Sequence, residues 1–162
     1  MASTIIPNCA LTVDVVLFAF ADNEPLKILL IERGRDPFAG SWALPGGFVD
    51  EGEDSQAAAA RELEEETGVK LEGLEYVRSF SAPGRDPRGR TISEAFTAVL
   101  PAESLTIRAG DDAAKAQLFV LDELPPLAFD HAQIIDAARE RIRQVFMRYD
   151  QRTIRAVRKA RL

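Results

Sequence analysis

Hydrophobic residues along this chain gather in short runs that are separated by turn-forming residues. Five runs are rich in valine, leucine, isoleucine, threonine or phenylalanine and are short enough for strands: residues 11–20, 26–32, 74–81, 91–100 and 117–121. Residues 22–25 (Asp-Asn-Glu-Pro) form a turn signal after the first run, and proline and glycine punctuate the chain after the second. The pattern predicts several short strands in one sheet.

Two longer segments show helical spacing. The first begins near Asp54 or Ser55, which are good N-cap residues, and ends at Gly68, a good residue just past a helix. The second covers residues 130–149, where apolar side chains such as Ile134, Ile135, Ala138 and Ile142 recur every three to four positions. Strands interleaved with helices predict an α/β fold, a mixed β-sheet sandwiched between helices.

The length of 162 residues predicts a single domain, which we assign to residues 1–147, followed by a basic tail at 148–162. The net charge is −6, and basic residues concentrate after residue 131. An acidic body argues against general nucleic-acid binding, and the basic tail is read as a solvated surface or as a segment that folds back on the body. The single cysteine, Cys9, allows no internal disulfide and favours a cytoplasmic location. The most apolar stretch, residues 9–20, is too short to cross a membrane.

Three carboxylates crowd one face of the first helix. Glu62, Glu65 and Glu66 stand at relative positions i, i+3 and i+4, so their side chains are neighbours that repel one another. A hard divalent cation such as Mg²⁺ takes oxygen ligands, commonly shares them with substrate phosphates, and would reverse the repulsion. The preceding loop, Pro45-Gly46-Gly47, permits the close backbone approaches that a phosphate site needs.

The spacing of these residues closely resembles the Nudix box, G-x5-E-x7-R-E-U-x-E-E-x-G-U with U apolar. Every fixed position is matched, by Gly47, Glu53, Arg61, Glu62, Leu63, Glu65, Glu66, Gly68 and Val69. The resemblance implies the Nudix fold, an α/β/α sandwich. It also implies a divalent-metal enzyme that hydrolyses a nucleoside diphosphate linked to another group.

The same resemblance implies a role for each residue of the box. The metal, Mg²⁺ or alternatively Mn²⁺, would be held by Glu62, Glu66, Glu65 as a further ligand, and the backbone carbonyl of Gly46. Glu53 and Arg61 would form an ion pair that orients the helix and the loop. Together these residues constitute the predicted catalytic set.

The general base is left open. Glu62 is one candidate, and Asp111 or Asp112 in a later loop is another, although the two aspartates are equally compatible with a turn or helix cap. Lys115 stands where related sequences carry an acid, which weakens the case for that loop.

A second informative segment is the loop at residues 81–93, which contains Arg85, Arg88 and Arg90 between prolines and glycines. Guanidinium groups suit phosphate, and the loop resembles that of ADP-ribose pyrophosphatases, with Pro83 fifteen residues beyond Gly68. The alternative is an ordinary basic surface loop. Arg33, at the end of a strand, resembles a residue that approaches substrate phosphates in relatives; its alternative is a surface ion pair.

Two aromatic residues are assigned structural roles. Trp42 is expected to pack beneath a loop, with adenine stacking as the alternative. His131, the single histidine, is expected to be structural or to lie at the substrate rim rather than to catalyse.

The sequence therefore favours hydrolysis of ADP-ribose, a nucleotide-sugar-type small molecule, to AMP and ribose 5-phosphate. NADH, a dinucleoside polyphosphate or an oxidised nucleoside triphosphate is the alternative substrate. A third hypothesis is an ADP-ribose-sensing regulatory module of NAD metabolism; the complete set of carboxylates and the short chain beyond the second helix argue against it. No membrane association is expected, and a homodimer is compatible with the resemblance.

Overall fold

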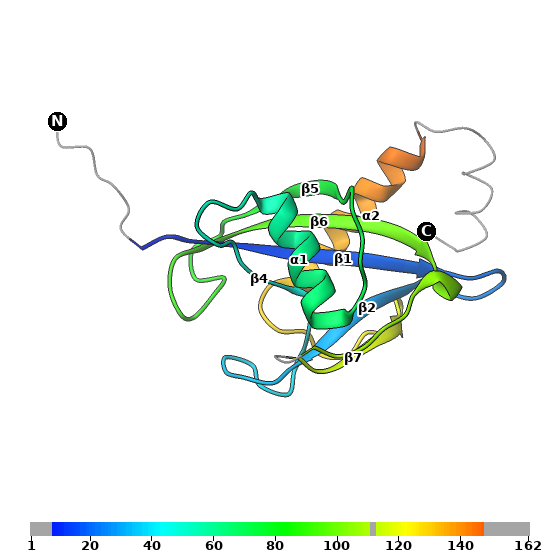
Figure 1. The fold of residues 1–162 in the computed structure, drawn as a ribbon, viewed down its shortest axis with the longest axis horizontal. Coiled ribbons are helices and arrows are strands. Elements are labelled where there is room, and N and C mark those ends of the chain that lie inside the picture. The colour runs from blue at the N-terminus through cyan, green and yellow to red at the C-terminus, as the bar shows by residue number, and fades with distance from the viewer. Residues whose placement is uncertain (1–7, 111–112, 148–162) are drawn as a thin grey trace.

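The computed structural model describes residues 8–110 and 113–147, which form one mixed sheet with helices on both faces (Figure 1). The strands are β1 (Ala10–Phe20), β2 (Lys27–Arg33), β3 (Trp42–Ala43), β4 (Gly46–Phe48), β5 (Glu75–Phe80), β6 (Thr91–Pro101) and β7 (Ala113–Val120). The helices are α1 (Ser55–Thr67), α2 (His131–Met147) and a short 3-10 turn, η1 (Ala102–Ser104).

The sheet has the order β3-β2-β1-β6-β5, with β4 paired to β1 and β7 paired to β2. Strands β1 and β6 run parallel along their full lengths, from Ala10 opposite Thr91 to Phe20 opposite Pro101. The other strand pairs are antiparallel. This mixture of parallel and antiparallel pairs confirms the predicted mixed sheet.

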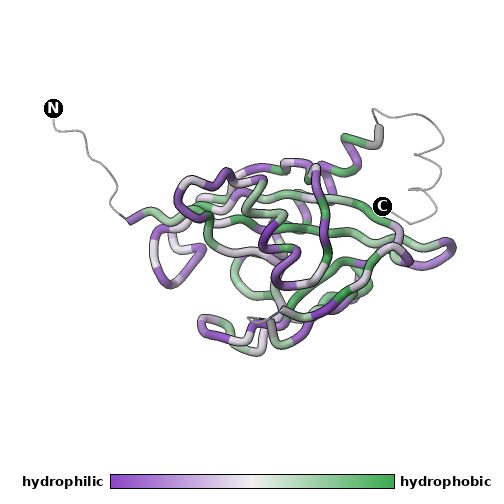
Figure 2. The backbone as a smooth tube through the Cα atoms, in the orientation of Figure 1, coloured by the Kyte–Doolittle hydropathy of each residue, from purple (hydrophilic) through white to green (hydrophobic). Residues whose placement is uncertain are grey.

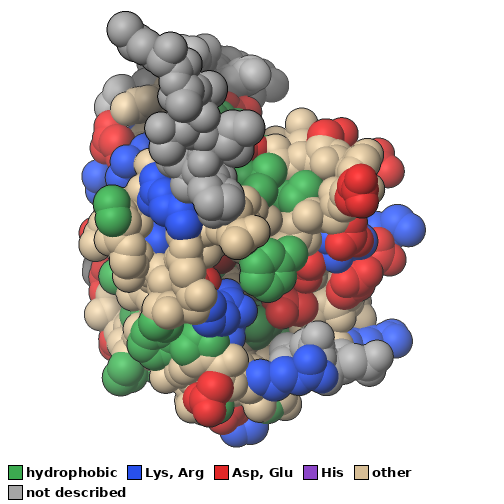
Figure 3. All heavy atoms as spheres, turned by 90° about the vertical axis from the view of Figure 1, so that its left-hand side faces the viewer, with side chains coloured by type: hydrophobic (Ala, Val, Ile, Leu, Met, Phe, Trp, Pro, Cys, Tyr) green, Lys and Arg blue, Asp and Glu red, His purple; other side chains and the backbone are tan. Residues whose placement is uncertain are grey.

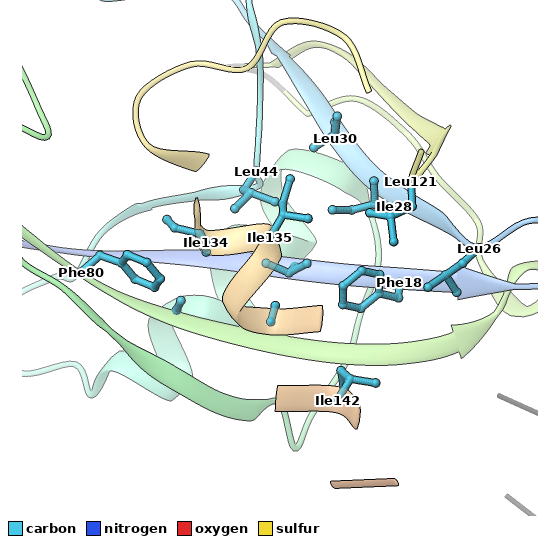
Figure 4. Close-up of a cluster of buried hydrophobic side chains, with 13 residues drawn as sticks. Phe18, Leu26, Ile28, Leu30, Leu44, Phe80, Leu121, Ile134, Ile135 and Ile142 are labelled. Atoms are coloured by element: carbon cyan, nitrogen blue, oxygen red, sulfur yellow. The ribbon is translucent and has the colours of Figure 1, made fainter. Parts of the chain in front are cut away.

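Strand β1 separates two hydrophobic cores. Val13, Val15 and Leu17 face the side covered by α1, whereas Val16 and Phe18 face the side covered by α2. Side chains alternate across a strand, so a strand that is buried on both faces is apolar nearly throughout. Figure 2 shows the apolar central strands. Figure 4 shows the cluster between α2 and the sheet, in which Ile134 and Ile135 of α2 lie with Phe18 of β1. The α/β/α sandwich is thereby confirmed.

Helix α1 has the ends that its sequence predicts. The Asp54 side chain accepts a hydrogen bond from the N–H of Ala57 at 2.9 Å, which caps the N-terminus. At the other end Gly68 adopts a left-handed conformation, φ 72°, and its N–H donates to the Glu64 carbonyl at 2.8 Å. The helix enters and leaves at fixed points, so its carboxylate face is held in a defined direction.

Some element boundaries differ from the prediction. Strand β7 is described from Ala113, four residues before the predicted start at 117, because it continues to pair with β2 through three alanines and a lysine, which carry little strand signal. Strands β3 and β4 were not predicted, since two or three residues are too few for a periodic pattern. Helix α2 is described from His131 to Met147, and the predicted end at 149 lies outside the described residues. The basic tail, 148–162, and Asp111 and Asp112 lie outside the described residues. No helix in the described part of the chain has the length and apolar character needed to span a membrane.

Candidate active site

Strand β4 and helix α1 bring the glycine loop against the carboxylates of the helix. The N–H of Gly46 donates to Glu66 Oε2 at 2.9 Å. A side chain at Gly47 would meet Glu62 Oε1 at 2.4 Å, and one at Gly46 would meet the Val13 carbonyl oxygen at 2.1 Å. Both glycines are therefore required by close packing, one against the carboxylate of the helix and one against the backbone of β1.

On the α1 side of the site, which we call the acidic side, one arginine donates hydrogen bonds to three carboxylates. Arg61 donates two hydrogen bonds of 2.9 Å to Glu53, one of 2.8 Å to Glu62 and one of 3.2 Å to Glu65. It also donates to the carbonyl of Phe48 at 3.0 Å, which ties the helix to β4. The predicted Glu53–Arg61 ion pair is present, and the hydrogen bond from Arg61 holds the pKa of Glu53 below its usual value.

Burial has the opposite effect on the two carboxylates that face the loop. It raises the pKa of Glu62, against the attraction of Arg61. It raises the pKa of Glu66 to about 8, and the nearby charges of Glu62 and Asp14 add to the shift while the hydrogen bond from Gly46 opposes it. Both side chains therefore hold a proton more tightly than an exposed glutamate does, because little water is available to stabilise their charged forms.

These oxygen donors fit a hard divalent cation. The carboxylates of Glu62 and Glu66 are the ligand type of Mg²⁺ or Mn²⁺, and a cation beside them would favour the ionised form of Glu66, whose pKa is raised chiefly by burial. Within residues 8–110 and 113–147, no three Asp, Glu, His or Cys side chains converge on a ready-made metal site. An incomplete set of protein ligands is expected where substrate phosphates complete the coordination of the cation.

A cleft of about 390 Å³ opens beside these carboxylates. Its walls come from β1, β2, β4, α1 and three loops, and the polar and aromatic members include Arg33, Arg35, Asp36, Phe48, Asp50, Glu62, Glu66 and Arg88. Figure 3 views the end of the molecule toward which the loops project; hydrophobic side chains there lie between basic and acidic groups. The volume is in the range that small-molecule ligands occupy, about 300–1,000 Å³.

The four predicted substrate arginines have different surroundings. Arg85 is 4% exposed and donates two hydrogen bonds to Asp130, at 2.9 and 2.7 Å, while Arg88 is bound in a similar way by Asp86. A smaller cavity next to the cleft is lined by Asp14, Arg85 and His131 among others. Arg90 lines neither the cleft nor this smaller cavity, and donates to the Ser81 carbonyl. Arg33 lines both cavities.

Arg33 is bound by backbone carbonyls rather than by an acid. Its Nε donates to the Pro37 carbonyl at 2.8 Å, and it forms no ion pair with a residue in the described ranges. Burial and the charge of Arg88 lower its pKa. Of the four arginines, Arg33 and Arg90 form no ion pair with a described carboxylate, and of these two Arg33 is the one that lines the cleft.

A buried polar network beneath the cleft was not predicted. Asp14, on β1, accepts a hydrogen bond from Ser93, lies 3.3 Å from His131 Nε2 and 3.7 Å from Arg85. The Nδ1 of His131 accepts from the N–H of Leu44 at 2.9 Å. Burial lowers the pKa of His131, in keeping with a neutral ring. The signal in the sequence was an aspartate inside an otherwise apolar strand.

Other residues of interest lie away from the cleft. Glu65 has a side chain 60% exposed and turns toward Arg61, so the structure does not bring it to the cleft wall with Glu62 and Glu66. Trp42 packs edge-on against Phe119 at 4.5 Å within the α2-side core, as its packing role predicts. Lys115 pairs with Glu32 at 2.8 Å.

An α/β/α sandwich in which a glycine loop packs against a helix rich in carboxylates is the arrangement that the resemblance to the Nudix box implies. The NUDIX domain model matches residues 10–138, and the chain belongs to this family, whose hydrolases generally use divalent metals.

Known relatives include both an enzyme and a regulator. The ADP-ribose pyrophosphatase of Methanocaldococcus jannaschii is 49% identical over 109 residues, which are 67% of this chain and 63% of that protein. The ADPR responsive transcriptional repressor NtrR of Acinetobacter baylyi is 36% identical over 140 residues, 84% of this chain and 55% of that protein. The chain thus spans less than two thirds of each of these relatives.

A solved structure with a ligand is also similar. The NUDIX domain of Shewanella oneidensis NrtR, crystallised with ADP ribose, superposes with a TM-score of 0.78 at 35% identity, and the match covers 85% of this chain and 90% of that one.

Proposed function

We propose that this chain is a divalent-metal-dependent pyrophosphohydrolase that converts ADP-ribose and water to AMP and ribose 5-phosphate. The observation that carries the proposal is that one cleft contains the partly buried carboxylates of Glu62 and Glu66 on one side and, on the other, the guanidinium of Arg33, which forms no ion pair within the described residues. The similarity to an ADP-ribose pyrophosphatase and to an ADP-ribose-bound NUDIX domain supports ADP-ribose as the substrate.

The acidic side of the cleft is where the metal would bind. Glu62, Glu66 and the Gly46 carbonyl would hold Mg²⁺, or Mn²⁺ in its place, with Glu65 as a further ligand that must first turn from Arg61. The bound cation would neutralise charge on the phosphates and lower the pKa of a bound water. Arg61 bonds to Glu53 and to the Phe48 carbonyl of β4, and so would fix the position of the helix relative to that strand. The metal ligands would then be oriented before the substrate binds.

The basic side positions the substrate. Arg33 would donate to the pyrophosphate oxygens, and Arg88 lies on the same cleft wall. Arg85, which is already bound by Asp130, would act by holding the loop, and Arg90 remains a weaker candidate for direct contact. The water that attacks phosphorus must lose a proton; Glu62 is the described carboxylate proposed to accept it, with Asp111 and Asp112 as the alternatives.

A substrate panel tests this proposal. Initial rates with ADP-ribose, NADH, a diadenosine polyphosphate and an oxidised nucleoside triphosphate should give the highest kcat/KM for ADP-ribose. The products should be AMP and ribose 5-phosphate in equal amounts, and a chelator should abolish turnover. A tenfold preference for another member of the panel would show that the substrate assignment is wrong.

The likeness to an ADPR responsive transcriptional repressor, and to a NUDIX domain of NrtR complexed with ADP ribose, favours one second function, an ADP-ribose-sensing module. Such a module would bind ADP-ribose without turning it over, and its protein would bind duplex DNA in a salt-dependent manner. Hydrolysis of ADP-ribose at an ordinary enzymatic rate, together with no DNA binding at low salt, would support the hydrolase over the sensing module. A cytoplasmic location and a homodimer are further parts of the proposal; size-exclusion chromatography with light scattering tests the latter.

A further inference from the structure

Phe48 is an exposed aromatic residue on a rigid part of the cleft wall. Its relative exposure is 49%, although it belongs to β4, where it pairs with Thr12 of β1. Its carbonyl accepts a hydrogen bond from Arg61, so the backbone is fixed on both sides. A large apolar side chain left in water beside a ligand-sized cleft is a feature that bound ligands commonly explain.

The Phe48 ring points away from the carboxylate helix. Gly47 faces Glu62, and successive residues of a strand face opposite sides, so the side chain of Phe48 is directed toward the loop that carries the arginines. The guanidinium carbon of Arg88 lies 5.2 Å from the Phe48 ring centroid and 5.8 Å from that of Phe129. Asp86 holds Arg88 in this position through hydrogen bonds at 2.7 and 3.0 Å.

The pair therefore presents a flat, apolar and cationic surface next to the proposed phosphate site. Aromatic rings and guanidinium planes are the groups on which nucleobases stack. A ribose, in contrast, is covered in hydroxyl groups that need hydrogen-bond partners, and a phenyl ring offers none. Trp42, the aromatic residue first considered for adenine, is committed to packing on Phe119.

We propose that Phe48 and Arg88 form the nucleobase site of this protein, where the adenine of the substrate stacks on the Phe48 ring while the phosphates lie between Arg33 and the carboxylates of α1. This assignment rests on the proposed function for the identity of the substrate. It places the AMP half of ADP-ribose at β4 and directs the ribose 5-phosphate half away from Phe48.

The test compares Phe48→Ala and Phe48→Trp with the wild-type protein, and uses Tyr76→Ala as a matched control. Tyr76 is a similarly exposed aromatic residue, at 44%, but it lies on β5 and lines neither cavity. For each protein, KM and kcat for ADP-ribose are measured together with the inhibition constants of AMP and of ribose 5-phosphate. Each product reports on one half of the substrate site.

Phe48→Ala should raise KM for ADP-ribose and the inhibition constant of AMP by the same factor, about tenfold, because stacking on an aromatic side chain is lost. The kcat and the inhibition constant of ribose 5-phosphate should change by less than about twofold, since the base is remote from the bond that breaks. Phe48→Trp should retain AMP binding, and Tyr76→Ala should behave as wild type. Unchanged melting temperatures would show that all variants are folded.

Two results would overturn the assignment: AMP inhibition that Phe48→Ala leaves unchanged, or a rise confined to ribose 5-phosphate. Calorimetric titration with AMP separates this outcome from failure of the proposed function. If the wild type binds AMP and Phe48→Ala weakens that binding, the base site stands even where ADP-ribose is not hydrolysed. Absence of AMP binding to the wild type contradicts the base site directly.

Discussion

The two sides of the cleft handle charge in opposite ways. On the α1 side, Arg61 donates hydrogen bonds to Glu53, Glu62 and Glu65, and no arginine of the described residues donates to Glu66. On the side of the loop at 81–93, Arg85 and Arg88 are each matched by their own aspartate. Among the described residues the α1 side has more carboxylates than cations and so is arranged to bind a cation, whereas two of the three arginines of the loop are already paired with aspartates and so are arranged to keep its shape.

This difference distinguishes arginines that can bind substrate from arginines that stabilise the loop. An arginine already held by two hydrogen bonds from a buried carboxylate must break them to reach a phosphate, and that cost opposes binding. Arg33 is held by backbone carbonyls and by contact with the Phe129 ring, whose centroid lies 4.9 Å from its guanidinium carbon, so it breaks no such ion pair. The comparison therefore predicts large stability effects at Arg85, large catalytic effects at Glu66, and substrate-affinity effects at Arg33.

The largest effect is expected at Arg85. Replacing it with alanine leaves Asp130 and the buried Asp14 without a cation, which should lower the free energy of unfolding by about 3–5 kcal/mol. Arg90→Ala is the control, because Arg90 is described only with a carbonyl partner and should cost much less. Denaturant unfolding of both variants measures the difference, and equal stability would show that the loop is not held in this way.

The Arg85–Asp130 pair is an example of a long-range contact that the sequence pattern does not predict. The box residues lie within about two helical turns and one loop, so their spacing alone gives the shared face of Glu62 and Glu66, and the ends of α1 follow from Asp54 and Gly68. Asp130 lies 45 positions from Arg85, and Ser93 lies 79 positions from Asp14. Local periodicity carries no information about such contacts, which depend on the parallel pairing of β1 with β6 and on the docking of α2. Strands β3 and β4 were missed for the related reason that tertiary pairing alone defines them.

A catalytic effect of similar size is expected at Glu66. Glu66→Gln keeps the shape of the side chain but removes the charge that would hold the metal, so kcat should fall by on the order of 10² or more at saturating Mg²⁺. Glu64→Gln is the matched control, since Glu64 is an exposed residue of the same helix. Near wild-type turnover by Glu66→Gln would remove this residue from the site.

The raised pKa of Glu66 predicts how stability depends on pH without metal. Because its pKa is about 8 in the folded protein and 4.5 for the free side chain, the folded state holds this proton more tightly, and stability should fall as pH rises from about 5 through 8. Melting temperatures in a chelator should show this decline, and Mg²⁺ should reduce it by replacing the proton. Glu66→Gln should lose the part of the slope that Glu66 contributes; an identical slope in the variant would contradict the assignment.

A smaller effect is expected at Arg33. Changing it to alanine should raise KM for the substrate about tenfold with a lesser change in kcat, because phosphate binding is largely shared by ground and transition states. Arg33→Lys should recover part of the loss by restoring a point charge without the planar fork. A fall in kcat with an unchanged KM would place Arg33 on the transition state alone.

The smallest effect concerns the pair that orients the acidic side. Glu53 and Arg61 share two hydrogen bonds of 2.9 Å, and Arg61 also reaches Glu62, Glu65 and the Phe48 carbonyl. Residues in such direct contact couple by about 0.5–3 kcal/mol in double-mutant cycles. Stability and kcat/KM should therefore be measured for Glu53→Arg, Arg61→Glu and the exchange of both. The exchange should recover part of what each single change loses, but not all of it, because a glutamate at 61 cannot donate to Glu62 or to the Phe48 carbonyl. Strictly additive losses would mean that Arg61 acts through its other partners and that the pair with Glu53 does not orient the helix.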